Sequence, residues 1–214
     1  MRLVLASNNP GKLAELQCLF APLGLQLVAQ GGLGIAEAEE PHATFIENAL
    51  AKARHAAAGS GEAAIADDSG LVVDALGGAP GVASAHFAPI EPAGGDREAR
   101  RRAQDAANNA LLLQLLGERS DRSARFVSTL VALRSAADPE PLVAVGRWPA
   151  EIARAPRGHG GFGYDPLVFV PALGKTVAEL DAAAKNTASH RALAASQMLV
   201  LMRDVWRLGQ GGIR

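Results

Sequence analysis

The first part of the chain alternates between short, mostly apolar runs and longer stretches with helical spacing. Residues 2–6 form such a run, and in residues 12–23 apolar side chains recur every three or four positions. A short continuous run predicts a buried strand, whereas the longer spacing predicts an amphipathic helix. The chain therefore begins as a strand followed by a helix, and Gly24 ends that helix.

The same reading extends to the rest of the chain. It predicts further strands at residues 25–28, 63–66, 71–73, 125–133, 142–147 and 166–170, and further helices at 44–58, 96–116 and 189–208. Thr44 and Glu47 have the spacing of a capping box at a helix start. An Ala-Asp-Pro turn joins the fourth and fifth of these strands into a predicted hairpin. Because strands and helices alternate before the hairpin, we predict an α/β fold with a mixed sheet.

The composition limits the classes of protein to consider. The 214 residues suit one large domain or two lobes that share a sheet, which we place at residues 1–208 with a frayed tail at 209–214. The formal net charge of −1 argues against a general nucleic-acid binder. We find no signal-peptide pattern and no apolar stretch of membrane-spanning length. We therefore expect a cytoplasmic protein without a membrane partner, with its single cysteine, Cys18, buried in a reducing compartment.

A candidate phosphate site lies in the turn between the first strand and the first helix, at Ser7, Asn8, Asn9, Pro10, Gly11 and Lys12. The unpaired N–H groups and the dipole of a helix start attract anions, and Lys12 adds a positive charge. The segment is not a Walker loop, since Ala6 and Leu13 stand where Gly and Ser or Thr are needed. An ordinary strand–helix turn with a surface lysine explains the same residues, so both interpretations stay open.

Two adjacent carboxylates, Asp67 and Asp68, follow a predicted buried strand. Buried carboxylates are costly unless they bind a cation or hydrogen-bond donors, and in extended backbone the two side chains point to opposite faces. Oxygen ligands at such a place suit Mg²⁺, with Glu39 or Glu40 as a further carboxylate. A turn after the strand and a solvated acidic loop are the alternative interpretations.

The glycine-rich segment at residues 160–165 brings two aromatic rings and a carboxylate together. Glycine lets the backbone approach a ligand closely, and the rings of Phe162 and Tyr164 could cover a nucleotide base. A hairpin loop with Phe162 in the core is the alternative.

Basic and polar residues cluster near the start of the last helix, at Lys185, Ser189, His190 and Arg191. Hydrogen-bond donors at a helix start suit an anion or a carbonyl oxygen, although basic side chains there oppose the helix dipole. A simple surface position for His190 is the competing interpretation.

Five segments, in the same order along the chain, resemble the inosine/xanthosine triphosphate pyrophosphatase family of house-cleaning enzymes. They are SNNPGKLAEL at 7–16, TFIENALAKA at 44–53, IADDSGLVVDALGGAPG at 65–81, GGFGYDPLVF at 160–169, and AEL, Lys and SHR within 178–191. Each segment alone is a weak signal, and the five together are very specific. One departure is His86, which stands where the family usually has Arg after Ser-Ala. If that Arg normally contacts phosphate, this chain binds phosphate less tightly or through other residues.

The resemblance implies an inosine triphosphatase-like α/β fold, with a mixed twisted sheet in two lobes, a substrate cleft between them, and usually a homodimer. It implies Mg²⁺-dependent hydrolysis of ITP, dITP and XTP to the monophosphate and pyrophosphate, which keeps deaminated purines out of DNA and RNA. Carried over to this chain, Glu39 and Asp68 would bind Mg²⁺, and Asp68 would also act as the base. Residues 7–12 and Lys52 would hold the phosphates, and Ser69 would contact the substrate. The purine base would be held by Phe162, Gly163, Tyr164, Asp165, Lys185, His190 and Arg191.

Two other functions stay open. The chain could be a related pyrophosphatase of the same fold for modified or pyrimidine nucleotides, against which residues 160–165 and 189–191 argue. It could also be a nucleotide sensor without turnover, against which the position of Asp68 argues. Pyrophosphate release across a panel of common and deaminated nucleotides would separate the three functions.

Overall fold

The computed structural model describes residues 1–90 and 96–209, which fall into two compact units. Unit 1 comprises the described residues of Met1–Asp68, Ser128–Arg147 and Asn186–Arg214, and unit 2 those of Ser69–Val127 and Trp148–Lys185. Residues 210–214 of the predicted tail lie outside the described residues. Each unit is built from segments that are far apart in the sequence, so neither is one continuous stretch of chain.

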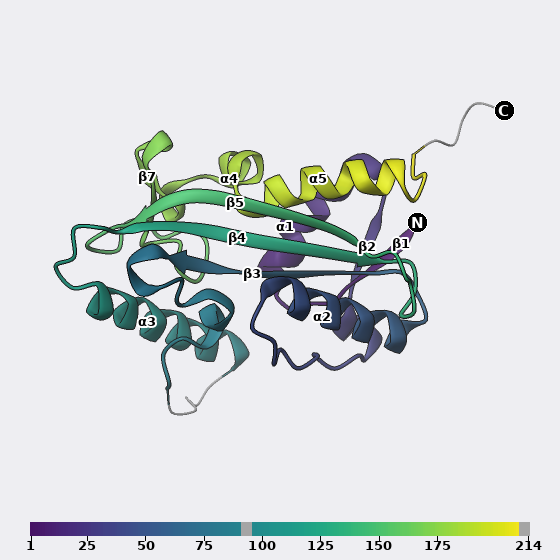
Figure 1. Cartoon of the computed structure of the whole chain (residues 1–214), viewed down its shortest axis with the longest axis horizontal. Helices are drawn as coiled ribbons and strands as arrows, with labels where there is room; N and C mark the ends of the chain where they lie inside the picture. The colour runs from purple at the N-terminus through teal and green to yellow at the C-terminus, as the bar shows by residue number, and fades with distance from the viewer. Residues whose placement is uncertain (91–95, 210–214) are drawn as a thin grey trace. The chain divides into compact units, whose positions relative to one another are not determined.

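Seven strands pair in the order β2-β1-β3-β4-β5-β6-β7 (Figure 1). They are β1 Arg2–Leu5, β2 Gln26–Ala29, β3 Ala64–Val73, β4 Ser123–Leu133, β5 Leu142–Ile152, β6 Val168–Val170 and β7 Lys175–Thr176. β1 pairs in parallel with β2 and β3, whereas β6 pairs antiparallel with β5 and β7. The mixed sheet confirms the predicted α/β class, and β4 and β5 are neighbours as the predicted hairpin requires. The long strands β3, β4 and β5 contribute residues to both units.

Three α-helices belong to unit 1, namely α1 Pro10–Phe20, α2 Phe45–Ser60 and α5 His190–Asp204. Alternate residues of β1 face different helices, because successive side chains of a strand point to opposite sides. Leu3 and Leu5 share an apolar cluster with residues of α1 and α5. Val4 and Ala6 share another cluster with the alanines of α2. Figure 1 shows α2 and α5 on opposite sides of the strands, so the two clusters are the two packed faces of unit 1.

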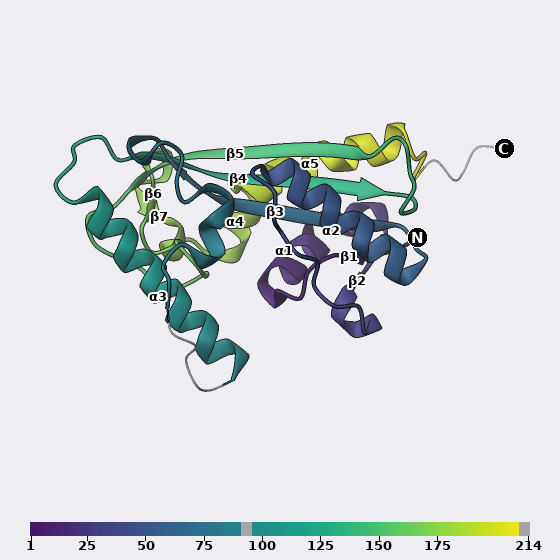
Figure 2. The same ribbon diagram turned by 60° about the horizontal axis from the view of Figure 1, so that its bottom comes forward.

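Unit 2 contains α3 Arg97–Leu116, a helix of 20 residues that Figure 2 shows over its whole length. The short α4 Ala182–Ala188 contributes residues to both units. The side chain of Asp96 caps α3 by accepting a hydrogen bond from the Ala99 N–H at 2.8 Å. Leu112 and Leu116 near the other end are buried. The polar start of this helix is therefore more exposed than its leucine-rich end, which is packed.

Most predicted elements are present, and three details differ. β3 continues without a break through Asp67 and Asp68, where the pattern predicts a strand end and a possible turn. Cys18 is exposed rather than buried, because Leu16 and Phe20 take the packed face of α1. α4 and β7 were not predicted, since α4 lies in an alanine-rich stretch without apolar periodicity and β7 has two residues. None of the described helices combines the length and apolar character needed to cross a bilayer.

Candidate active site

The opening turn forms the predicted helix start, and Asn9 is its N-cap. The Asn9 side-chain oxygen accepts hydrogen bonds from the N–H groups of Gly11 at 2.9 Å and Lys12 at 3.3 Å. Pro10 stands at the first helical position and has no N–H. The first-turn N–H groups that were expected to be unpaired are thus already bonded. The ammonium group of Lys12 is the strongest attraction that this turn offers to an anion.

Asp67 collects three donors within unit 1. Its wholly buried carboxylate accepts hydrogen bonds from Ser128 Oγ at 2.7 Å and Arg191 Nε at 3.0 Å, and Lys12 Nζ lies 3.1 Å away. Burial by itself raises the pKa of Asp67, but Lys12 and Arg191 outweigh burial and hold that pKa well below its usual range. A second nitrogen of Arg191 pairs with Glu15. Asp67 therefore stays ionised and fixes two cations in place.

Asp68, the next residue of β3, pairs with Lys52 of α2. Lys52 Nζ lies 2.6 Å from Asp68 Oδ1 and 3.1 Å from Glu40 Oε2. Burial raises the pKa of Asp68 to about 6, while Lys52 opposes this rise and the Glu40 carboxylate adds to it. Burial lowers the pKa of Lys52, but the two carboxylates outweigh burial and raise it. Asp68 is thus a buried carboxyl group that gains and loses its proton near neutral pH, which suits a general base.

The oxygens around Asp68 fit a hard divalent cation. Oδ2 of Asp68 is buried and accepts no hydrogen bond from the described residues, and Glu40 lies within hydrogen-bonding reach of the same carboxyl group. Mg²⁺ commonly takes one or two protein carboxylates and completes its shell with waters and phosphate. Among the described residues, no group of three or more His, Cys, Asp or Glu side chains is placed to hold a metal ion. Glu39, the predicted second carboxylate, is exposed, and it is Glu40 that reaches Lys52.

In unit 2, the predicted base-binding residues gather around Asp165. Asp165 Oδ2 accepts hydrogen bonds from the Phe162 N–H at 3.0 Å and from Lys185 Nζ at 2.9 Å. Lys185 Nζ also lies 4.7 Å from the centre of the Phe162 ring, within cation–π range. Tyr164 is buried and its hydroxyl donates to the Ser84 carbonyl at 2.9 Å, and burial raises the pKa of Tyr164. Tyr164 thus supports the segment from inside, whereas Phe162 is half-buried and keeps part of its ring accessible.

Two glycines permit this arrangement. A Cβ atom on Gly161 would lie 2.0 Å from Asp165 Oδ2, so any side chain there would displace the carboxylate. Gly161 has φ +75° and Gly163 has φ +63°, in the left-handed region that L side chains rarely adopt. From the sequence we expect glycine to let the backbone approach a ligand closely. In the structure, the backbone at Gly161 instead approaches the Asp165 side chain.

The residues at the start of α5 are buried and belong to unit 1. Ser189 caps the helix by accepting a hydrogen bond from the Ala192 N–H at 3.2 Å. His190 is buried, which excludes the surface interpretation of that residue. Arg191 is 2% exposed, and its guanidinium group faces Asp67 and Glu15. The structure thus gives Arg191 carboxylate partners rather than an open position toward a base.

The other predicted contact residues have modest roles in the structure. Asn8 Oδ1 accepts a hydrogen bond from the Gly31 N–H at 2.9 Å, and Ser7 Oγ accepts one from the Asn9 N–H at 3.2 Å. Ser69 is half-buried in β3, in unit 2. The Ser7 and Asn8 side chains order the turn in which they lie.

Sequence reasoning missed the partners that set the charges in unit 1. Glu15 lies three residues after Lys12 in α1, a spacing that puts both side chains on one face of the helix. Ser128 interrupts the apolar strand at 125–133, and a buried hydroxyl in such a run requires a hydrogen-bond partner. Both signals are present in the sequence, but neither identifies Asp67 or Arg191 as the partner.

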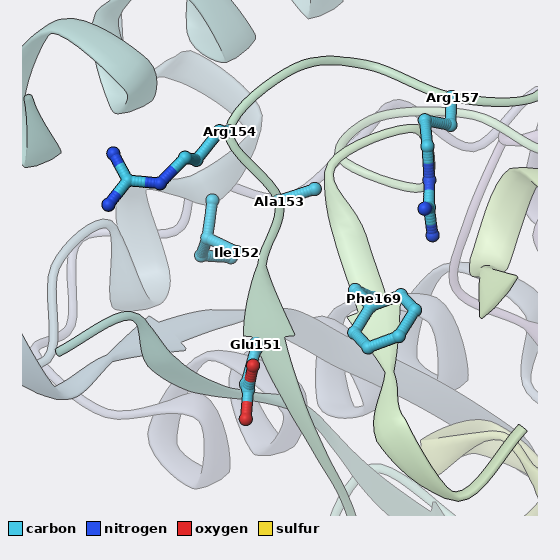
Figure 3. A pocket seen from close by; sticks show the side chains of 6 residues that line it. All are labelled: Glu151, Ile152, Ala153, Arg154, Arg157 and Phe169. Atoms are coloured by element: carbon cyan, nitrogen blue, oxygen red, sulfur yellow. The ribbon is translucent and has the colours of Figure 1, made fainter. Parts of the chain in front are cut away.

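A surface pocket lies elsewhere in unit 2, lined by Glu151, Ile152, Ala153, Arg154, Arg157 and Phe169 (Figure 3). Arg157 stacks over the Phe169 ring at 5.0 Å, and Arg154 pairs with Glu118 at 2.9 Å. Figure 3 shows the side chain of Arg154 directed away from Phe169 and Arg157. The two arginines therefore do not converge on a ligand, and none of the predicted site residues lines the pocket.

Comparison with known proteins covers nearly the whole chain. A model of the Ham1 family matches residues 3–201. A protein of Methylibium petroleiphilum named dITP/XTP pyrophosphatase is 68% identical over 206 residues, which are 96% of this chain and 99% of that protein. A protein of the same name from Leptothrix cholodnii is 68% identical over 211 residues, which are 97% of this chain and 100% of that protein.

Solved structures agree with the fold. A HAM1 protein from Coxiella burnetii has a TM-score of 0.84 at 41% identity and covers 96% of this chain and 100% of its own. A Ham1 protein from Staphylococcus aureus has a TM-score of 0.78 at 35% identity, covering 94% of this chain and 98% of its own. These likenesses extend over the full set of elements and are not confined to one motif.

Proposed function

We propose, because this chain belongs to the Ham1 family, that it hydrolyses noncanonical purine nucleoside triphosphates such as dITP, ITP and XTP. The products would be the nucleoside monophosphate and pyrophosphate. One observation carries the proposal: two relatives named dITP/XTP pyrophosphatase are 68% identical to this chain, over 96% and 97% of its length. The site residues support it, because they provide the charges and the buried carboxyl group that this reaction needs.

Lys12 and Lys52 would bind the phosphates. Both ammonium groups are largely shielded from water, with side-chain exposures of 17% and 10%, so they act at low dielectric. Each is held by a carboxylate, Asp67 for Lys12 and Asp68 for Lys52. Cations fixed before the substrate arrives stabilise charge that develops on phosphate oxygens without further reorganisation.

Asp68 would act as the general base that takes a proton from the attacking water. Lys52 holds Oδ1, which leaves the buried Oδ2 free of hydrogen bonds from the described residues. Glu40 and Asp68 would hold Mg²⁺, which would neutralise charge on the phosphate oxygens when bound. Lys52 orients the Asp68 carboxyl group, and the proton would leave the water toward Asp68 as water attacks the α-phosphorus.

Phe162, Lys185 and Asp165 of unit 2 would recognise the base. Asp165 fixes the ammonium group of Lys185 beside the Phe162 ring, which puts a donor next to an aromatic surface. A donor can meet the 6-oxo group of hypoxanthine or xanthine, whereas adenine would bring its own 6-amino donor to the same place. Such an unpaired buried group lowers kcat/KM by about 10⁴-fold or more when water is excluded.

The test is product analysis with dITP and Mg²⁺, followed by kcat/KM for ITP, XTP, ATP and GTP at one Mg²⁺ concentration. We expect dIMP and pyrophosphate. Deoxyinosine diphosphate with inorganic phosphate as the main products would contradict the reaction. Equal values for ATP and ITP would defeat this recognition of the 6-oxo group alone. A panel that favours pyrimidine nucleotides would support the related-pyrophosphatase alternative, and binding without pyrophosphate release would support a sensor.

We further propose that the enzyme works as a homodimer in the cytoplasm. The exposed thiol of Cys18 is compatible with a reducing compartment. Light scattering during size-exclusion chromatography measures the assembly, and a mass of one 22.1 kDa chain at micromolar concentration would contradict the dimer.

A further inference from the structure

One face of α3 points its polar side chains at the segment around Phe162. Arg101, Asp105 and Asn109 follow one another at intervals of four residues, so their side chains lie on the same face of the helix. All three contact residues 162–163 within unit 2. The polar first half of α3, which the apolar pattern leaves without a role, is therefore directed at the predicted base-binding segment.

Asp105 and Asn109 together bind both backbone polar groups of Gly163. Asp105 Oδ2 accepts a hydrogen bond from the Gly163 N–H at 3.0 Å, and Asn109 Nδ2 donates one to the Gly163 carbonyl at 2.9 Å. Gly163 has φ +63°, a conformation that glycine adopts readily and other residues rarely do, so glycine suits this position. The Arg101 guanidinium lies 5.9 Å from the centre of the neighbouring Phe162 ring. This one helical face therefore contacts two consecutive residues of the segment.

Asn109 carries a free-energy cost that an apolar side chain at this position would avoid. Its side-chain Oδ1 is buried and accepts no hydrogen bond from the described residues. A buried polar atom without a partner is destabilising, and a smaller or apolar side chain would not carry it. The position is better explained by what its amide nitrogen does, which is to hold the Gly163 carbonyl.

A second pair of residues on α3 binds the stretch of backbone to which Tyr164 of the same segment is bonded. Gln104 and Asn108 are also four residues apart, and their amide groups donate to the carbonyls of Ala88 and Ser84. The Ser84 carbonyl also accepts the hydroxyl hydrogen of Tyr164 at 2.9 Å. The segment is thus connected to α3 directly through Gly163 and indirectly through Tyr164.

We propose that Asp105 and Asn109 are positioning residues that hold Gly163, and with it Phe162 and Asp165, in the geometry that binds the purine base. This inference rests on the proposed function, in which Phe162 and Asp165 recognise the base. Asp105 and Asn109 act through the backbone of Gly163 and do not contact the substrate. Burial raises the pKa of Asp105, against the Gly163 N–H and the charge of Arg101.

The test compares Asp105→Leu and Asn109→Leu with wild type in hydrolysis of dITP. We expect KM to rise roughly 2- to 10-fold in Asn109→Leu, which removes a neutral hydrogen bond, and at least as much in Asp105→Leu, which removes a hydrogen bond to a carboxylate, with kcat within twofold in both. Asp105→Asn keeps an oxygen that can accept from Gly163 N–H, so it should restore a KM near that of wild type. Asn109→Asp keeps the size of the side chain but loses the donor, so it should raise KM as Asn109→Leu does.

A matched control separates positioning from stability. Arg122 bonds the backbone carbonyls of Ile152 and Gly117 elsewhere in unit 2, so Arg122→Met should lower the melting temperature and leave KM unchanged. Hydrogen exchange of the Gly163 amide, which needs no activity, should accelerate in Asp105→Leu and stay slow in Arg122→Met. A wild-type enzyme that does not hydrolyse dITP would refute the proposed function. An active wild type whose two leucine variants keep both KM and Gly163 exchange unchanged would overturn this inference.

Discussion

Unit 1 and unit 2 hold their polar residues by different means. In unit 1, Asp67 and Asp68 are fixed by the charged groups of Lys12, Arg191 and Lys52, and their pKa values move in opposite directions. In unit 2, residues 160–165 are held largely through backbone hydrogen bonds and one buried ion pair. In unit 1, the charge pairs determine which groups are ionised. In unit 2, the hydrogen bonds and the ion pair determine where the Phe162 ring and the Lys185 ammonium group lie. Under the proposed function, unit 1 would carry the proton and phosphate chemistry, and unit 2 would hold the residues that recognise the base.

Asp68→Asn breaks the chemistry of unit 1 most directly, and we expect turnover to fall by about 10²- to 10⁴-fold. Stability should not fall with it. The pKa of Asp68 in the fold is raised to about 6, so the fold binds this proton more tightly than the unfolded chain does. Stability from this group is present at low pH and lost as pH rises through about 6, so the neutral amide removes a cost at pH 7. The amide also takes one of two carboxylates from the Lys52 ammonium group, so the two effects oppose each other and the net change in stability should be small.

Pyrophosphate release and thermal unfolding at pH 7.0 measure the two effects of Asp68→Asn separately. Glu40→Gln, which leaves Asp68 in place, is the companion variant and should lose less activity. If Asp68→Asn retains activity within a few-fold of wild type and unfolds at the same temperature, Asp68 is not the base.

Asp67→Asn should give the largest loss of stability, about 3–5 kcal/mol, because it leaves two buried cations without their shared counter-charge. The pKa of Asp67 is depressed, so its contribution is present at neutral pH and is lost only in strongly acidic solution, as pH falls through the folded-state pKa. Asp165→Asn in unit 2 should cost less. It leaves one cation, Lys185, and its amide oxygen can still accept from the Phe162 N–H.

Urea unfolding at pH 7 measures the two losses side by side. Equal losses for Asp67→Asn and Asp165→Asn would show that the two units rely on charge pairing to the same extent, contrary to the comparison.

Lys12→Ala should raise KM for dITP by about 10- to 100-fold, since a hydrogen bond to a charged group contributes about 1.5–3 kcal/mol. The effect on kcat should be smaller, because Lys52 and Asp68 keep their pairing. Lys175→Ala removes an exposed lysine of β7 and serves as the matched control, with no expected change. Steady-state kinetics measure KM and kcat for dITP. An unchanged KM in Lys12→Ala would show that the opening turn has only a structural role.

The smallest effect concerns pH. At limiting Mg²⁺, kcat/KM should fall as pH drops through about 6, where Asp68 becomes protonated. A bound divalent cation favours the ionised carboxyl group, so saturating Mg²⁺ should move this acidic limb to lower pH. Rate measurements from pH 4.5 to 8 at two Mg²⁺ concentrations test it. An acidic limb that occurs at the same pH at both Mg²⁺ concentrations would show that the metal does not bind Asp68.

Much of the fold could be predicted from the sequence because its elements are locally consistent. The periodicity of residues 12–23 and the capping box at Thr44 fix α1 and α2 without knowledge of their neighbours. The continuous course of β3 could not be predicted, because Asp67 and Asp68 are polar and poor strand formers. They remain in the strand because residues outside it supply the donors: Ser128 and Arg191 bind Asp67, and Lys52 binds Asp68.

The sequence nominates residues for the candidate site, whose roles stay predictions, but it does not predict how those residues pair. Lys12, Lys52 and Asp68 stand out in motifs, whereas the choice of Glu40 over Glu39 depends on how a loop without regular structure turns toward Lys52. The turn at Asn9 is a further example. The sequence predicted the helix start there, but not that the Asn9 side chain accepts hydrogen bonds from the N–H groups that were expected to be unpaired. Local patterns identify chemistry, while long-range packing decides which groups meet.

The distance along the chain between Asp67 and Arg191 has a consequence for synthesis. The two residues are 124 positions apart, and Arg191 lies near the end of the chain. A nascent chain emerges from the ribosome N-terminus first, so the strands around Asp67 are available long before α5 is. Until α5 arrives, Asp67 has only part of its counter-charge, which disfavours its burial. Unit 1 therefore cannot complete the charge pairing around Asp67 until α5 has been synthesised.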